Sequence, residues 1–169
     1  MSRKLLEILE PCTISRTTFT DSGTTVNVRV KPKESVRFYV IDETSNPRST
    51  LRENLKIEKR ICDLVVYYTK TLEITNSGEI FCLVELKGKK IKDAVDQITD
   101  TFNVLKSHSG KKIKWKAYIL INLASHIYIG ETERRKLKQQ FGPHGWRITK
   151  NNDNDDLGGF LRKTEPLSE

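Results

Sequence analysis

The sequence predicts an α/β fold, a single domain with a central mixed β-sheet flanked by helices. Apolar residues recur at steps of three and four between Lys90 and Lys106, which indicates an amphipathic helix, and strand-like runs precede and follow it. The run from Trp115 to Leu123 is almost continuously apolar, as is typical of a strand buried on both faces. Residues 1–169 are enough for one core and too few for two ordinary domains.

The N-terminal part, residues 1–48, is predicted to be a helix and hairpin extension of a core that covers about residues 50–150. The segment 3–10 has the apolar spacing of a short helix, which Pro11 ends. Residues 13–22 are rich in Ser and Thr, and we expect them to form a loop or an edge strand.

The predicted hairpin consists of strands at 25–31 and 36–41, because the Pro32–Ser35 link between them has the composition of a turn. Residues 44–50 are expected to form a turn or loop. The next stretch, 52–60, is mostly charged and fits either a short helix or an extended approach to the following strand.

The second half of the chain alternates strands with helices. Strands are predicted at 61–69 and 79–87, joined by a turn at Asn76-Ser77-Gly78. After the central helix and the apolar strand, we expect a second helix at 131–141 and a short last strand at 146–150. This order supports one α/β domain.

The composition is strongly basic. The chain has 30 Lys and Arg residues against 22 Asp and Glu, a net charge of +8. This balance favours polyanionic partners such as nucleic acid or an anionic membrane surface, although a solvated basic surface would have the same composition.

Several classes of function are disfavoured. Cys12, Cys62 and Cys82 have no metal-ligand spacing, which argues against a zinc site, and an odd number of cysteines suggests a reducing compartment. No run approaches the roughly 18 apolar residues of a membrane span, so we expect no membrane partner and a cytoplasmic location.

Three charged residues interrupt the two central strands. Asp63 lies in an apolar run, and Glu85 and Lys87 lie in the next. Alternation places Glu85 and Lys87 on one face, and Asp63 joins them if the strands pair as a hairpin. Burying such charges without partners is costly. The simplest explanation is an ion-paired sheet edge with no chemistry.

The alternative is a metal site. Two adjacent carboxylates repel each other unless a cation lies between them, and their hard oxygen atoms suit Mg²⁺ or Mn²⁺. Such a cation could activate a water molecule for attack on a phosphodiester. Lys87 could then orient or deprotonate that water, or stabilise charge in the transition state.

Asp63, followed after a gap by Glu85-Leu86-Lys87 and then by a helix, resembles the PD-(D/E)XK nuclease superfamily, which includes many restriction endonucleases and archaeal Holliday-junction resolvases. The resemblance implies a restriction-endonuclease-like αβββαβ core, expected within residues 50–123. It also implies a Mg²⁺-dependent or Mn²⁺-dependent DNA endonuclease or exonuclease, in phage defence, restriction or DNA repair. Asp63 and Glu85 would bind the metal, and Lys87 would assist the attacking water. Cys62 stands where the family has Pro.

The resemblance implies further site residues. Gln97 matches a glutamine that some members carry on the helix after this motif. Many members have another acidic metal ligand upstream, for which either Glu53 or Glu58 is the candidate, with Glu7 or Glu10 as alternatives. Small members commonly act as homodimers or in larger defence or repair complexes.

Basic residues surround the predicted site. Lys89 and Lys90 are the best-placed nucleic-acid contacts, because they lie at the strand-to-helix turn. Arg134, Arg135 and Lys138 are expected to be solubility charges, and Trp146 to be a core residue.

Two rival functions remain open. One is a catalytically inactive nuclease-fold module that binds nucleic acid. The other is a small basic interaction subunit in which Glu85 and Lys87 are structural.

Overall fold

The computed structural model describes residues 3–70, 78–87, 90–110, 113–122, 128–150 and 156–163. In chain order the described elements are α1 (Arg3–Leu9), the 3₁₀ turn η1 (Glu10–Cys12), β1 (Thr13–Ile14), β2 (Thr18–Asp21), β3 (Thr24–Asn27), β4 (Glu34–Val40), α2 (Leu51–Leu55), β5 (Leu64–Lys70), β6 (Ile80–Lys87), α3 (Ile91–Lys106), β7 (Lys114–Ile121), α4 (Glu131–Phe141), β8 (Trp146–Lys150) and α5 (Leu157–Arg162).

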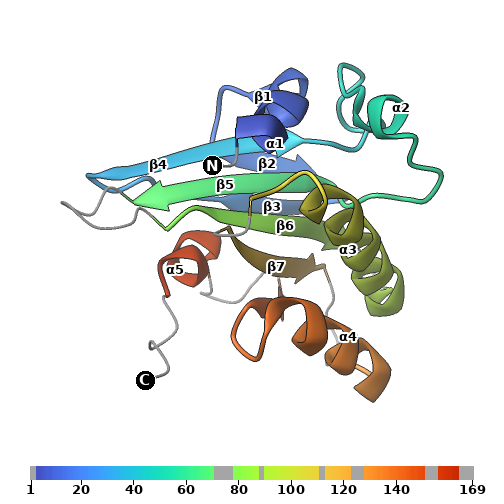
Figure 1. The fold of residues 1–169 in the computed structure, drawn as a ribbon. Helices are drawn as coiled ribbons and strands as arrows, with labels where there is room; N and C mark the ends of the chain where they lie inside the picture. The colour runs from blue at the N-terminus through green and yellow to red at the C-terminus, as the bar shows by residue number, and fades with distance from the viewer. Residues whose placement is uncertain are drawn as a thin grey trace.

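The strands form a six-stranded mixed sheet in the order β1-β4-β5-β6-β7-β8 (Figure 1). The pairs from β1 to β6 are antiparallel, whereas β6, β7 and β8 run parallel to one another. The predicted fold class, a single α/β domain with a mixed sheet flanked by helices, is confirmed at this level.

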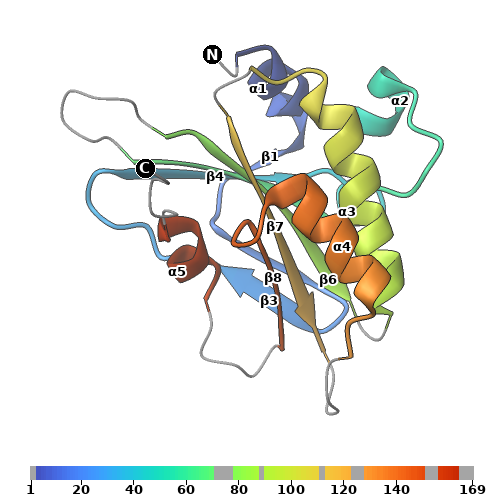
Figure 2. The ribbon, with the colours of Figure 1, turned by 60° about the horizontal axis from the view of Figure 1, so that its bottom comes forward.

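Both faces of the sheet are covered (Figure 2). One face packs against α1, α3 and α4 in a core that includes Val65, Leu83 and Ile119. The opposite face packs against α5 and a separate β2–β3 hairpin, with Val66 and Val84 in its core. Successive strand residues alternate between the two cores because side chains of a strand point to opposite faces. Burial of β7 on both faces is therefore confirmed.

The hairpin prediction was wrong, because β3 pairs with β2 and not with β4. Ser22 and Gly23 have φ angles of 50° and 72°, the left-handed pair that a two-residue hairpin turn requires. This turn fixes the partner of β3, and β4 instead lies between β1 and β5. The N-terminal residues thus contribute β1 and β4 to the sheet and do not form a separate extension.

The boundaries also differ around the central strands. Residues 50–123 hold only β5 and β6 before α3, and the third strand of this meander is β4. The charged stretch is helical through Leu55, where Lys56 with φ 52° ends α2, and it is irregular up to β5. Of the predicted turn Asn76-Ser77-Gly78, only Gly78 lies within the described residues.

Helix α5 was not predicted, and a buried lysine holds its end. Lys116 is 1% exposed, and its ammonium donates to the carbonyl oxygens of Phe160 at 2.7 Å and Lys163 at 2.8 Å. The same ammonium lies 4.6 Å from the centre of the Phe160 ring. Because the last carbonyls of a helix lack partners within the helix, Lys116 satisfies groups that burial would otherwise leave without hydrogen bonds.

Lys116→Met is therefore expected to lower the free energy of unfolding by about 1–3 kcal/mol, the cost of leaving buried carbonyls without a donor. Urea denaturation followed by circular dichroism measures this loss. The matched control is Lys92→Met on the exposed side of α3. Equal stability of the two variants would contradict the capping role.

Candidate metal centre

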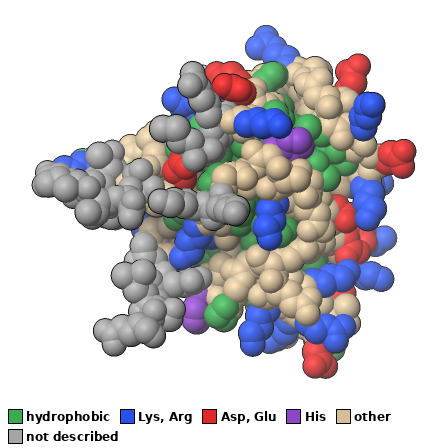
Figure 3. All heavy atoms as spheres, viewed as in Figure 1, with side chains coloured by type: hydrophobic (Ala, Val, Ile, Leu, Met, Phe, Trp, Pro, Cys, Tyr) green, Lys and Arg blue, Asp and Glu red, His purple; other side chains and the backbone are tan. Residues whose placement is uncertain are grey.

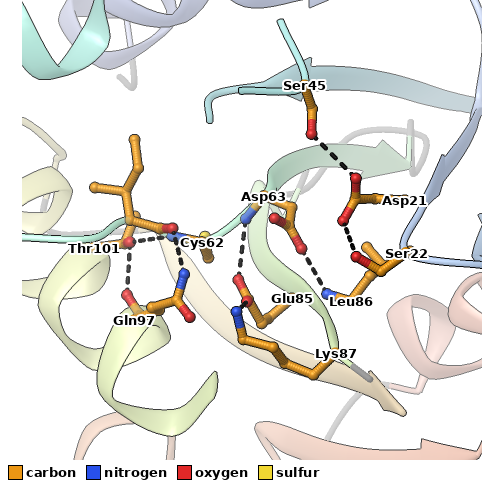
Figure 4. Close-up of polar contacts among 11 residues, drawn as sticks. Asp21, Ser22, Ser45, Cys62, Asp63, Glu85, Leu86, Lys87, Gln97 and Thr101 are labelled. Carbon is orange, nitrogen blue, oxygen red and sulfur yellow. Dashed lines mark hydrogen bonds and ion pairs between the residues drawn. The ribbon is translucent and has the colours of Figure 1, made fainter. Parts of the chain in front are cut away.

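Asp63 and Glu85 lie side by side on neighbouring strands. Leu64 pairs with Val84, so Asp63, the residue before β5, comes next in register beside Glu85. The Asp63 N–H donates to Glu85 Oε2 at 3.2 Å, and the Leu86 N–H donates to Asp63 Oδ2 at 2.7 Å (Figure 4). Asp63 is 6% exposed and Glu85 is fully buried. The hairpin pairing of these strands thus brings the two carboxylates together.

Lys87 completes the group from the same strand. Its Nζ lies 2.6 Å from Glu85 Oε1, and its side chain is 23% exposed. The pair is therefore arranged with the carboxylate inside and the ammonium toward solvent. A single lysine does not compensate both carboxylates, so the site retains unneutralised negative charge when both are ionised.

The pKa values of both carboxyl groups are raised in this buried site. Burial raises the pKa of Asp63 to about 7, against the lowering effect of the Leu86 N–H, and the negative charge of Asp21 raises it further. Burial also raises the pKa of Glu85 to about 8, with the adjacent Asp63 adding to the rise and Lys87 opposing it. Both carboxyl groups would ionise more readily if a cation lay beside them.

Helix α3 holds the backbone that carries Asp63. The Gln97 amide donates to the Ile61 carbonyl oxygen at 3.0 Å, and the Cys62 N–H donates to Thr101 Oγ1 at 2.9 Å. The Thr101 hydroxyl in turn donates to the main-chain carbonyl oxygen of Gln97 at 2.7 Å (Figure 4). Gln97 thus contacts the site through this backbone segment. Its side-chain oxygen is buried and has no hydrogen-bond partner among the described residues.

A pocket of about 340 Å³ opens beside Lys87 and Gln97. Its remaining lining residues are Asp42, Glu43, Thr44, Arg52, Arg60 and Ile61. This volume is within the range of small-molecule sites, about 300–1,000 Å³. The pocket gives Lys87 a solvent-facing side next to the buried carboxylates.

The upstream acidic residues named from the sequence are not at the site. Glu53 lies on α2 and Glu58 follows it, and both are exposed, with neither lining the pocket. Glu7 and Glu10 are also exposed, on the first helical segment. The resemblance implied an upstream acidic ligand without fixing which residue supplies it, and none of the four candidates is among the groups whose charges shift the pKa of Asp63.

The acidic residues that lie near Asp63 are Asp21 and Asp42, whose charges both raise its pKa. Asp21 ends β2 and accepts hydrogen bonds from the Ser45 hydroxyl at 3.3 Å and the Ser22 hydroxyl at 2.7 Å (Figure 4). Asp42 lies two residues after the end of β4, and its position after an apolar strand was a signal that sequence reasoning missed. No sequence pattern could have identified Asp21, because only the packing of the β2–β3 hairpin brings it near Asp63.

Within the part of the chain that the structure describes, no three His, Cys, Asp or Glu side chains are grouped closely enough to hold a metal ion. A cation beside Asp63 and Glu85 would therefore need water or substrate oxygens in addition to these two carboxylates.

The predicted nucleic-acid contacts are only partly described. Lys90 is exposed at the start of α3, whereas Lys89 lies outside the described residues. In the described ranges, no helix has the length and apolar character needed to cross a membrane.

Comparison with known proteins gives no match: neither a family model nor a curated protein matches this sequence. The function is therefore inferred from the geometry of the site.

Proposed function

We propose that this protein is a metal-dependent nuclease that hydrolyses phosphodiester bonds in DNA. The observation that carries the proposal is the buried pair Asp63, directly before β5, and Glu85 on β6, with Lys87 2.6 Å from Glu85 and lining a pocket. The net charge of +8 and the exposed Lys90 support a polyanionic substrate.

The topology supports the same proposal. The order α1, β4, β5, β6, α3, β7 is a helix, three antiparallel strands, a helix and a strand parallel to β6. With β1, β2, β3 and α2 set aside, this order matches the αβββαβ order that the resemblance to the PD-(D/E)XK superfamily implies, with Asp63 directly before the second strand and Glu85 and Lys87 at the end of the third.

The carboxylate oxygens of Asp63 and Glu85 are the kind of ligand that a hard divalent cation prefers. The raised pKa values of both groups show that their negative charge is disfavoured in this site, and a neighbouring cation would relieve that cost. When bound, Mg²⁺ or Mn²⁺ would supply Lewis-acid polarisation of the phosphate and a lower pKa for the attacking water. Asp63 and Glu85 would hold the cation, and α3 fixes the backbone that orients Asp63. The Lys87 ammonium, released in part from Glu85, donates hydrogen bonds to phosphate oxygens as charge develops there.

The proposal is tested by incubating plasmid and single-stranded DNA with the protein and Mg²⁺ or Mn²⁺. Glu85→Ala should lose cleavage. The control Glu79→Gln alters an acidic residue at the other end of the same face, where the carboxylate accepts from the Tyr67 hydroxyl at 2.9 Å, and it should retain cleavage. Glu53→Gln and Glu58→Gln should also retain it. Absence of metal-dependent cleavage of every DNA form by the wild type would refute the proposal for this chain.

A second candidate is an inactive nuclease-fold module that binds nucleic acid. The absence of a third acidic ligand grouped with Asp63 and Glu85 in the described structure favours it. It predicts DNA binding without turnover, and no change in binding on Glu85→Ala beyond the effect of one charge.

A further inference from the structure

A second pocket, of about 620 Å³, lies between α4 and the edge strand β8. Its lining residues are Glu131, Arg134, Arg135, Lys138, Gln139 and Trp146. None of these residues belongs to the group around Asp63 and Glu85. The pocket is therefore a separate surface feature that the proposed hydrolysis does not use.

Three basic side chains that line this pocket have no acidic partner among the described residues. Arg134, Arg135 and Lys138 are exposed, and none forms an ion pair among the described residues. Lys136 on the same helix differs, because its ammonium lies 2.7 Å from Asp96 on α3. Figure 3 shows Lys and Arg side chains along the lower part of the molecule, where α4 lies in Figure 1. With Glu131 as the only acidic lining residue, the pocket favours an anionic ligand.

The aromatic part of the pocket is Trp146 at the start of β8. Its ring is only partly buried, packing on the core beneath α4 and lining the pocket as well. Its indole N–H is buried and has no acceptor within the described structure, an arrangement that costs free energy. A purely structural tryptophan would explain the packing. It would not explain why the ring lines the same pocket as three cations that form no ion pair among the described residues.

The position of α4 relates the pocket to the candidate metal centre. Lys136 contacts Asp96, and Gln140 contacts Asn103 at 3.4 Å, so α3 and α4 lie side by side and run in the same direction (Figure 2). Since β6 and β7 are parallel, α3 and α4 both begin at the sheet edge where Lys87 ends β6. The basic surface of α4 thus extends from that edge along the molecule.

We propose that the α4–β8 pocket binds an unpaired segment of a nucleic-acid strand, with a base stacked on Trp146 and phosphates against Arg134 and Arg135. An aromatic face bordered by cations is the combination by which proteins hold single strands, because every base has a stacking face and every linkage a negative charge. Duplex would offer the phosphates without a free base. This binding does not depend on hydrolysis, so its test can be run with metal removed.

The first test measures binding of a fluorescein-labelled oligothymidylate in EDTA. The double variant Arg134→Ala/Arg135→Ala should bind at least about tenfold more weakly. The slope of the logarithm of the binding constant against the logarithm of the salt concentration should become shallower by about 1.4, since each phosphate contact on a single strand contributes about 0.7. The charge-matched control Lys4→Ala/Arg16→Ala alters α1 and the residues after β1, at the opposite sheet edge (Figure 1). Equal affinity of the two double variants would overturn the proposal.

The second test uses the fluorescence of Trp146. Oligothymidylate should quench the emission of the wild type and leave Trp146→Phe, in which the buried Trp115 remains, unquenched. Full quenching in Trp146→Phe, or equally tight binding of a blunt duplex, would overturn the stacking of an unpaired base. Loss of cleavage in Glu85→Ala with oligothymidylate binding intact separates this pocket from the catalytic proposal.

Discussion

Lys87→Met is expected to reduce metal-dependent DNA cleavage by about 10²–10³-fold, the usual effect of removing one donor that stabilises transition-state charge. The Lys87 ammonium lies 2.6 Å from Glu85, where it both pairs with the carboxylate and borders the pocket. Methionine keeps the length of the side chain and removes the charge. Initial cleavage rates at saturating Mn²⁺ measure the loss.

Metal binding should respond to Lys87→Met in the opposite direction. The substitution removes no oxygen ligand, and it removes a positive charge that competes with the cation for Glu85. Calorimetric titration should therefore show Mn²⁺ affinity equal to or higher than that of the wild type. Lys87→Arg should restore part of the cleavage, and Lys92→Met should leave it unchanged. Wild-type cleavage by Lys87→Met, or loss of its metal binding, would contradict the assigned role.

The second large effect is a dependence of stability on pH and metal. Without divalent cations, the free energy of unfolding should fall as pH rises from about 4 to about 8. The pKa of Asp63 is raised from 3.8 to about 7, and that of Glu85 from 4.5 to about 8. Across this window the folded state binds more protons than the unfolded state, so raising the pH favours unfolding. The fall should be on the order of a few kcal/mol.

Saturating Mn²⁺ should flatten this dependence, because the cation takes the place of the protons at both carboxyl groups. The stabilisation by Mn²⁺ should accordingly grow from pH 5 to pH 8. Urea denaturation at a series of pH values, in EDTA and in Mn²⁺, measures both curves. The Asp63→Asn/Glu85→Gln variant provides the control and should show neither the fall nor the metal effect. A wild-type curve that Mn²⁺ leaves unchanged would count against the site.

A separate group governs the acid end of the same curve. The pKa of Glu34 is lowered from 4.5 to about 2, chiefly by the hydrogen bond from Arg162. Its contribution is present above pH 4.5 and is lost as the pH falls toward 2, the opposite sign to Asp63 and Glu85. The two windows meet only near pH 4, so the fall in the free energy of unfolding between about pH 5 and about pH 8 can be assigned to Asp63 and Glu85.

The elements with strong local patterns could be predicted from the sequence. The bounds of α4 and β8 agree with the prediction, and α3 agrees to within one residue, because helical and strand periods were clear there. The pairing of β3 depended instead on the Ser22-Gly23 turn. Helix α5 contains Gly158 and Gly159, which disfavour a helix, and its burial beside Lys116 compensates.

The same distinction applies to the candidate site. Alternation along one strand placed Glu85 and Lys87 on one face, because strand geometry is local. Asp63 joins them only through the pairing of β5 with β6. Asp21, at the end of β2, and Asp42, after β4, approach Asp63 through tertiary packing, which no sequence period reports. Trp146 was expected to be core. Its place in one pocket with the exposed cations of α4 follows from the pairing of β8 with β7.

The central claim, that Asp63 and Glu85 together bind a divalent cation, is tested most directly by anomalous diffraction from crystals soaked in Mn²⁺. The account predicts a peak about 2.0–2.2 Å from a carboxylate oxygen of each residue, close to the distances of hard divalent cations. The peak should disappear in crystals of Glu85→Gln. A well-diffracting wild-type crystal with no peak between Asp63 and Glu85, or with Mn²⁺ bound only elsewhere, would contradict the claim.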